Sequence, residues 1–246
     1  MIDLTDDDDA PVSAQAPAPA PARAPAPVSA PVDVRRITVP GGVLDDSLLA
    51  QVDAIGQQSN CVGCDGRGLA AGVAAKFPWG CSYGDRRRMP PANKFAVAED
   101  RAVPGTIDVR RGPQPGTPRV INMFAQYEMG GPGKYRRVEF PPGVTDLAPQ
   151  REAWFAQCLD AIAQLPDRPA SIAFPREIGC GLAGGNWPRY ERMIEDFARS
   201  SGIAVTIATL PGAPPGGGGG KGRGGGKGRG GGKGRGGGGG GGGRGN

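Results

Sequence analysis

The two ends of this 246-residue chain have compositions that cannot form a packed core. Residues 10–31 are almost wholly Ala, Pro, Ser and Val, and Pro recurs at nearly every second position, which favours an extended conformation. Residues 212–246 are mainly Gly with regularly spaced Lys and Arg, so ordering them costs more conformational entropy than their contacts offset. We therefore expect disordered tails over 1–31 and 212–246, and one domain over 32–211.

The formal net charge of +5 belongs to the tails rather than to the domain. The C-terminal tail carries seven Lys and Arg residues and no acidic residue, whereas the first nine residues contain five Asp. Without these two groups the net charge is about +3, which is unremarkable for a domain of this size. The basic character therefore says little about what the domain binds.

The sequence contains no apolar run long enough to span a membrane, so we expect no membrane partner. The acidic N-terminus differs from the basic, then apolar pattern of a secretory signal. The five cysteines are odd in number and do not form a paired framework. These features favour an intracellular, reducing compartment, either the cytoplasm or the nucleus.

The chain has no histidine, and this absence excludes several kinds of chemistry. Ser-His-Asp and Cys-His catalysis, histidine general bases and histidine metal ligands all require an imidazole. Any reaction must therefore depend on carboxylates, Lys, Tyr, backbone amides or the ligand itself.

Apolar periodicity between the tails alternates between strand-like and helix-like segments. Strands are predicted at 34–39, 52–58, 94–98, 106–110, 119–124, 171–174 and 203–210. Helices are predicted at 45–51 and 69–77, and two longer ones begin near Pro149 and Pro188. This alternation predicts an α/β domain in which helices cover both faces of a mixed sheet, a three-layer α/β/α arrangement.

Two Gly-rich loops, 59–72 (SNCVGCDGRGLAAG) and 174–187 (FPREIGCGLAGGNW), each run from a predicted strand into a predicted helix. Glycines let backbone N–H groups approach a ligand closely, and a helix N-terminus adds a partial positive charge. One such loop alone is more often a tight turn. Two of them at the carboxyl ends of strands in one α/β domain favour a shared site for a diphosphate.

In these loops the sequence resembles the macro domain family. Segment 66–78 after Asn60 (GRGLAAGVAAKFP) looks like the family's first ribose and phosphate segment. The second loop is similar to that of the branch containing terminal ADP-ribose protein glycohydrolases and ADP-ribose-1″-phosphate phosphatases. Within that branch, members from phages and large viruses look most similar to this sequence. Strand 120–126 (VINMFAQ) also resembles a recurring family strand. The resemblance extends over 34–210 and implies a macro-type domain that binds ADP-ribose or ADP-ribosylated protein without a cofactor.

The resemblance also implies which residues contact the ligand. Backbone amides of the second loop would surround the diphosphate, Asn60 would lie near the distal ribose, and the other residues would line the cleft. The implied ligand-binding residues are Asn60, Gly66, Gly68, Ala70, Gly72, Phe124, Gln126, Gly179, Cys180, Gly181, Leu182, Ala183, Gly184 and Gly185.

Several positions depart from the family pattern. Gly42 stands near the position where many members have an Asp that binds adenine, so adenine selectivity is open. The Lys and Asp of the glycohydrolase branch correspond to Met123 or Phe124 and to Ala183. Asn186 stands where related sequences often have an Asp, and Asn cannot act as a general base.

The lysine–aspartate mechanism is therefore not expected. The candidate catalytic residues are Asp65, Glu177 and Asn186, and attack by a water activated by the substrate itself is an alternative. We expect an ADP-ribose-derivative hydrolase. The alternatives are a reader that binds ADP-ribose without turnover and a nucleic-acid-binding protein whose domain is only a scaffold.

The cysteines offer two further interpretations. Cys61 and Cys64 have metal-ligand spacing and Cys81 follows, but a structural zinc site needs four ligands, so we expect no metal. Cys180 lies inside the second loop, where a helix N-terminus could activate a thiol, although simple burial explains it equally well.

Both tails suggest partners. Residues 2–9 (IDLTDDDD) resemble a SUMO-interacting motif, which would imply a eukaryotic cell or its virus; the alternative is a solubilising acidic end. Residues 216–246 repeat Gly-Gly-Lys-Gly-Arg-Gly, and spaced cations on a flexible chain suit contact with nucleic-acid phosphates. Without aromatic residues for base stacking, the tail is equally compatible with a solubilising linker.

Overall fold

Six strands form one mixed sheet in the order β1-β6-β5-β2-β4-β3. Neighbouring strands are parallel except for β3, which pairs antiparallel with β4 at one edge. The strands are β1 (Arg35–Thr38), β2 (Ala54–Asn60), β3 (Ile107–Arg110), β4 (Arg119–Gln126), β5 (Ser171–Pro175) and β6 (Ala204–Thr209). The expectation of a mixed sheet is confirmed.

This computed structural model describes residues 33–91 and 93–213. The acidic segment 2–9, the Pro/Ala-rich segment 10–31 and the basic tail 216–246 lie outside the described residues, so the expectations for them stay predictions. No helix in the described ranges is both long enough and apolar enough to cross a membrane.

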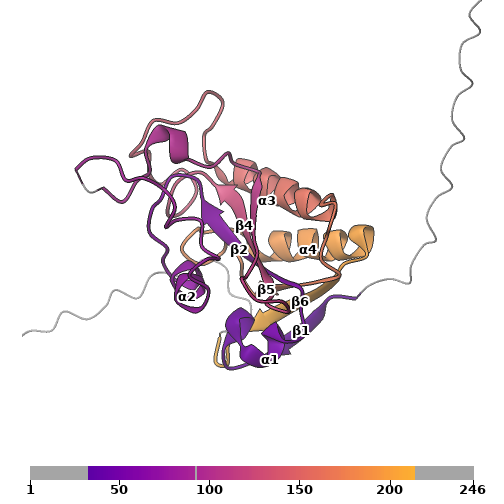
Figure 1. Cartoon of the computed structure of the whole chain (residues 1–246). Coiled ribbons are helices and arrows are strands. Elements are labelled where there is room, and N and C mark those ends of the chain that lie inside the picture. Colours follow the sequence, from indigo (N-terminus) through magenta and orange to yellow (C-terminus); the bar gives the residue numbers. More distant parts are fainter. Residues whose placement is uncertain (1–32, 92, 214–246) are drawn as a thin grey trace, which may run out of the picture. The chain divides into compact units, whose positions relative to one another are not determined.

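Helices cover both faces of the sheet, as Figure 1 shows. Helices α3 (Ala148–Ala163) and α4 (Trp187–Ser201) pack on one face, and α1 (Asp46–Leu49) and α2 (Leu69–Lys76) lie on the other. Two short 3₁₀ turns, Gly42–Leu44 and Ala98–Asp100, connect other segments. The three-layer α/β/α arrangement is therefore confirmed.

Alternate residues of the inner strands belong to different apolar clusters. On β5, Ile172 and Phe174 pack with α3 and α4, whereas Ala173 between them packs with α1 and α2. Successive side chains of a strand point to opposite faces, so a strand that is buried on both faces contributes to both clusters. Strand β5 is therefore apolar at each of these three successive positions.

The two longer helices begin where the sequence predicts. Pro residues stand in the first turns of α3 and α4, where the missing N–H would have no partner within the helix. The Asn186 side chain caps α4 by accepting a hydrogen bond from the Arg189 N–H at 3.2 Å. Gly202 ends α4 in a left-handed conformation with φ of 71°.

Segment 94–98 differs from the predicted strand. It forms only isolated bridges, Phe95 to Gly63 and Ala96 to Arg88. Its backbone pairs with the loop after β2, since the Cys64 N–H donates to the Lys94 carbonyl at 2.9 Å and the Ala96 N–H donates to that of Val62 at 2.8 Å. The apolar pattern therefore reflects the burial of Phe95 and Ala96 beneath this loop rather than membership of the sheet.

We expect Gly56→Ala to destabilise the domain. A Cβ at Gly56 in β2 would lie 2.3 Å from Cε1 of the fully buried Phe174. Overpacking of this kind costs about 1–3 kcal/mol of unfolding free energy, measured by urea denaturation. The control is Gly84→Ala, because the Cβ at Gly84 meets nothing within 4 Å. Equal stabilities of the two variants would contradict the expectation.

Candidate functional site

A pocket of about 390 Å³ opens at the carboxyl ends of β2, β4 and β5. Gln58 and Asn60 from β2, Gln126 from β4 and Pro175 from β5 contribute to its lining. Ligand crevices in α/β sheets generally lie outside the carboxyl ends of parallel strands. The sheet therefore places this pocket where the loops after its central strands meet.

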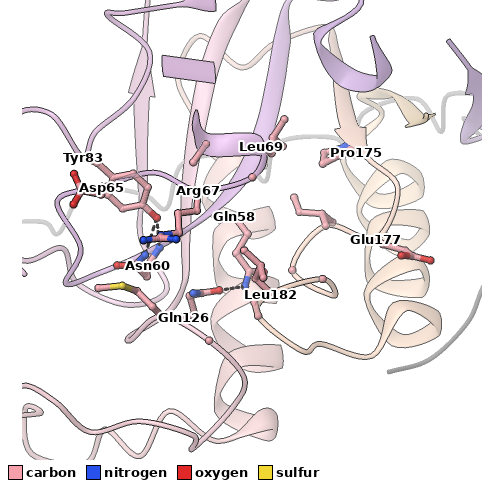
Figure 2. Close-up of a pocket in the computed structure, with 18 of the residues that line it drawn as sticks. Gln58, Asn60, Asp65, Arg67, Leu69, Tyr83, Gln126, Pro175, Glu177 and Leu182 are labelled. Carbon is pink, nitrogen blue, oxygen red and sulfur yellow. Dashed lines mark hydrogen bonds between the residues drawn. The ribbon is translucent and has the colours of Figure 1, made fainter. Parts of the chain in front are cut away.

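Both Gly-rich loops line this one pocket (Figure 2). The first loop contributes residues 60, 65 and 67–70, and the second contributes 175–179 and 181–183. Gly68 and Gly179 have positive φ values of 59° and 71°, a conformation that side-chain-bearing residues rarely adopt. The two turns thus approach one cavity rather than opposite faces of the molecule.

The second loop has backbone amides available to a ligand. Within the described part of the chain, the N–H groups of Gly181, Leu182 and Ala183 donate to no acceptor. The neighbouring amides of Gly184 and Gly185 are engaged, donating to the Gly181 and Gly179 carbonyls at 3.1 and 2.9 Å. A fixed turn that presents unbonded N–H groups favours an anion such as a phosphate.

The floor of the pocket is polar. Gln58 donates through Nε2 to Gln126 Oε1 at 2.9 Å, and Gln126 donates in turn to the Glu128 carbonyl at 3.2 Å. A Cβ at Gly179 would lie 2.2 Å from Gln58 Oε1. The second loop therefore lies directly against this pair of amide side chains, and Gly at position 179 allows that close approach.

Asn60 and Tyr83 hold the start of the first loop. The Tyr83 hydroxyl accepts hydrogen bonds from the Asn60 N–H at 2.8 Å and from Asn60 Nδ2 at 2.9 Å. Asn60 Oδ1 accepts from the Gly63 N–H at 2.6 Å. Burial raises the pKa of the Tyr83 hydroxyl, so this group stays protonated near neutral pH and does not act as a base.

Some of the expected site residues line the pocket and others do not. Those in the lining are Asn60, Asp65, Gly68, Ala70, Gln126, Glu177, Gly179, Gly181, Leu182 and Ala183. Those outside the lining are Gly66, Gly72, Phe124, Cys180, Gly184, Gly185 and Asn186.

Most residues outside the lining have a packing or capping position. Gly72 faces Leu44, because a Cβ there would lie 3.0 Å from Leu44 Cδ1. A Cβ at Gly66 would lie 3.0 Å from the Ala70 carbonyl carbon. Phe124 is buried, with the Arg86 guanidinium 5.3 Å from its ring centre.

The two candidate carboxylates have other contacts. Asp65 forms an ion pair with Arg88 at 2.5 Å, and hydrogen bonding to Arg88 holds the pKa of Asp65 below its usual value. Arg176 lies 3.4 Å from Glu177, and in Figure 2 the Glu177 carboxylate points away from the Asn60 and Gln126 side chains. An ionised Asp65 is not a general acid, and neither carboxylate is directed at the polar floor.

Four of the cysteines are buried and Cys180 is partly buried. Burial raises the pKa of the Cys180 thiol to about 12, and its Sγ lies 3.3 Å from the Ile178 carbonyl oxygen. Cys180 is therefore protonated near neutral pH and is a poor nucleophile. Cys61 and Cys64 are buried free thiols, and in the described ranges no group of three or more Cys, Asp or Glu residues is placed to hold a metal ion.

Several lining residues were not expected from the sequence, among them Gln58, Arg67, Tyr83, Met129 and Gly130. Arg67 could have been predicted from the sequence, because a lone cation between two glycines of a ligand-facing loop is suited to bind an anion. No sequence feature predicts Met129 and Gly130 as site residues, since they follow β4 in an irregular segment that only the fold brings to the pocket.

Comparisons with known proteins gave similarities among solved structures alone: no protein-family model and no curated protein matches the chain. The macrodomain of Mycobacterium tuberculosis DarG is 18% identical with a TM-score of 0.44, and the match covers 74% of this chain and 100% of that one. The macrodomain of Thermus aquaticus DarG is 21% identical with a TM-score of 0.45, covering 72% and 99%. An alphavirus P23pro-zbd structure is 16% identical with a TM-score of 0.43, covering 71% and 21%. In fold, this chain is similar to macrodomains.

Proposed function

We propose that the pocket binds ADP-ribose or a molecule that carries it, with the diphosphate on the backbone amides of the two Gly-rich loops. The observation that supports this most directly is that both loops line one pocket, with the free N–H groups of Gly181, Leu182 and Ala183 at its edge. Arg67 lies in the same lining and adds a cation. These groups suit two adjacent phosphates better than an uncharged ligand.

The polar floor supports a sugar nucleotide rather than a bare anion. Amide side chains such as Gln58 and Gln126 can both donate to and accept from ribose hydroxyls. The resemblance of both loops to macro domains indicates ADP-ribose within that class.

Calorimetry of the full chain with ADP-ribose tests this proposal. We expect a one-to-one complex in which ADP-ribose binds more tightly than adenosine, because adenosine lacks the diphosphate. Absence of binding, or equal affinity for adenosine and ADP-ribose, would exclude the proposed arrangement.

We further propose hydrolysis of an ADP-ribose derivative, either ADP-ribose-1″-phosphate or ADP-ribosylated protein, on the basis of the resemblance to hydrolytic macro domains. Because Asp65 is paired with Arg88 and Glu177 points away from the floor, the attacking water would be activated by the bound substrate. The same observation favours the second candidate, a reader without turnover. Prolonged incubation of both substrates with stoichiometric protein decides between them, because survival of both substrates identifies a reader.

The basic tail is proposed to contact nucleic acid, independently of the pocket. We expect deletion of 216–246 to remove salt-sensitive RNA binding and to leave the affinity for ADP-ribose unchanged. The reason is that Lys and Arg residues that bind nucleic-acid phosphates displace counterions, which makes the affinity depend on salt, and the tail contains seven such residues. Filter binding at two salt concentrations measures this, and an unchanged RNA affinity would show that the tail is a linker.

Residues 2–9 are proposed to bind SUMO through an added strand flanked by acids. Titration of the full chain with SUMO, with Ile2→Ala and Leu4→Ala together as the control variant, tests this proposal. If the variant binds SUMO as tightly as the wild type, residues 2–9 are not the binding segment.

A further inference from the structure

Arg151 is a buried arginine that donates hydrogen bonds to two segments of the pocket lining. It stands near the start of α3 and is 2% exposed. Its Nη1 donates both to the Gly130 carbonyl at 2.7 Å and to the Ala183 carbonyl at 3.0 Å. Gly130 and Ala183 both line the pocket, although they are far apart in the sequence. A single nitrogen atom therefore joins the segment after β4 to the second Gly-rich loop.

The remaining donors of Arg151 are also engaged. Nη2 donates to the Glu128 carbonyl at 3.1 Å and to Asp146 Oδ2 at 2.6 Å, and Nε donates to Asp146 Oδ1 at 2.7 Å. With the two bonds from Nη1, all five N–H donors of the guanidinium have an acceptor. The position of this side chain is therefore fixed from several directions.

Asp146 anchors the arginine from the other side. Its carboxylate also accepts from the Tyr127 and Glu128 N–H groups at 2.9 and 3.0 Å, and its carbonyl accepts from the Gly133 N–H at 3.0 Å. Asp146 is 1% exposed and has a positive φ of 57°, which is uncommon for a residue with a side chain. The surroundings therefore hold the Asp146 backbone in this strained conformation.

The two segments also touch directly. A Cβ at Gly184 would lie 3.3 Å from Pro132 Cδ and 3.4 Å from Gly131 Cα. The contact is thus close but consists of small groups, which fix a distance poorly without a directional bond. Arg151 supplies such bonds, because it donates to the carbonyls of Gly130 and Ala183 in addition to Asp146 and Glu128.

We propose that Arg151, held by Asp146, is a positioning residue that sets the separation of segment 128–133 and loop 181–184, and with it the placement of the free amides of that loop. The effect on ligand rests on the proposed function, whereas the coupling of the two segments does not. A lysine cannot replace the arginine, because an ammonium lacks the planar fork that reaches four groups at once.

The test is Arg151→Lys in the full chain, which keeps the charge beside Asp146. Amide hydrogen exchange without ligand should accelerate at least tenfold at Gly133, Gly184 and Gly185, whose N–H groups donate to the carbonyls of Asp146, Gly181 and Gly179. The reference is the Val39 N–H, bonded to Thr209 at the far edge of the sheet, which should exchange at the wild-type rate.

In the same variant, calorimetry should show at least a tenfold loss of affinity for ADP-ribose and a change of less than twofold for adenosine. If Arg151 only stabilised the fold, the variant would lose affinity for both ligands by the same factor. The matched control is Arg189→Lys, which alters an exposed ion pair with Glu152 and should change neither measurement.

Wild-type exchange rates in the folded variant would overturn the proposal, and so would equal losses for both ligands. If the wild type binds no ADP-ribose, the proposed function fails, while the exchange rates still decide whether Arg151 couples the segments. If Arg151→Lys does not fold, wild-type exchange in low urea decides instead. Opening of Gly133, Gly184 and Gly185 as one unit supports the coupling, and separate opening free energies exclude it.

Discussion

Gly181→Glu is expected to lower the affinity for ADP-ribose at least a hundredfold while leaving the fold intact. A hundredfold loss corresponds to about 2.7 kcal/mol of binding free energy. Gly181 lies in the pocket lining, its φ is not positive, and a Cβ there meets no atom within 4 Å. The glutamate side chain therefore fits without backbone strain and brings a carboxylate to the amides proposed to hold the diphosphate. The repulsion between like charges in this partly enclosed site opposes binding.

Calorimetry and thermal unfolding together measure this effect. Gly84→Glu is the matched control, because a Cβ at Gly84 is equally unobstructed and that residue lies outside the pocket lining. The control should bind like the wild type, and both variants should unfold at the wild-type temperature. Undiminished binding by Gly181→Glu would place the ligand elsewhere.

Asp146→Ala is expected to produce the largest loss of stability, about 3–5 kcal/mol of unfolding free energy. The change leaves the buried Arg151 without its carboxylate and removes the acceptor of the Tyr127 and Glu128 N–H groups. Breaking one side of a buried ion pair costs far more than the pair itself contributes, because the remaining charge stays desolvated. The positive φ at this position adds strain in the alanine variant.

Urea denaturation compares this variant with Asp167→Ala. Asp167 pairs with Arg111 at the surface, where its side chain is 57% exposed. Exposed pairs contribute about 0–1 kcal/mol, since water solvates the partner that remains. A loss below 1 kcal/mol for Asp146→Ala would show that the buried charges are relieved by rearrangement and would weaken the role given to Arg151.

Much of the fold could be predicted from the sequence, because alternating strands and helices leave a strong apolar period. Strands β4, β5 and β6 are mostly buried and rich in apolar residues, and Pro149 and Pro188 mark the starts of the two long helices. The strand predicted at 94–98 was wrong. Its apolar residues are buried beneath a loop, and periodicity alone does not distinguish a loop partner from a sheet partner.

The candidate site could be predicted in part. The two Gly-rich loops carry their own signal and the structure places both at one pocket, whereas Gly130 reaches the pocket only through the tertiary fold. Arg151 did leave a trace, since it occupies the first position of the buried stripe of α3, in register with Trp154 and Phe155. A charged residue at such a position indicates a buried network, and Asp146 is close in sequence. The other partners, Gly130 and Ala183, lie in segments whose proximity the sequence does not encode locally.

The complete engagement of Arg151 has a consequence for the way a ligand associates. Segments 128–133 and 181–184 are ordered when the chain folds. The entropic cost of immobilising them therefore does not reduce the free energy of ligand binding. The pocket is thus preorganised and does not need to close around its ligand. In such a receptor, related ligands differ mainly in residence time, because encounter requires no rearrangement of the host.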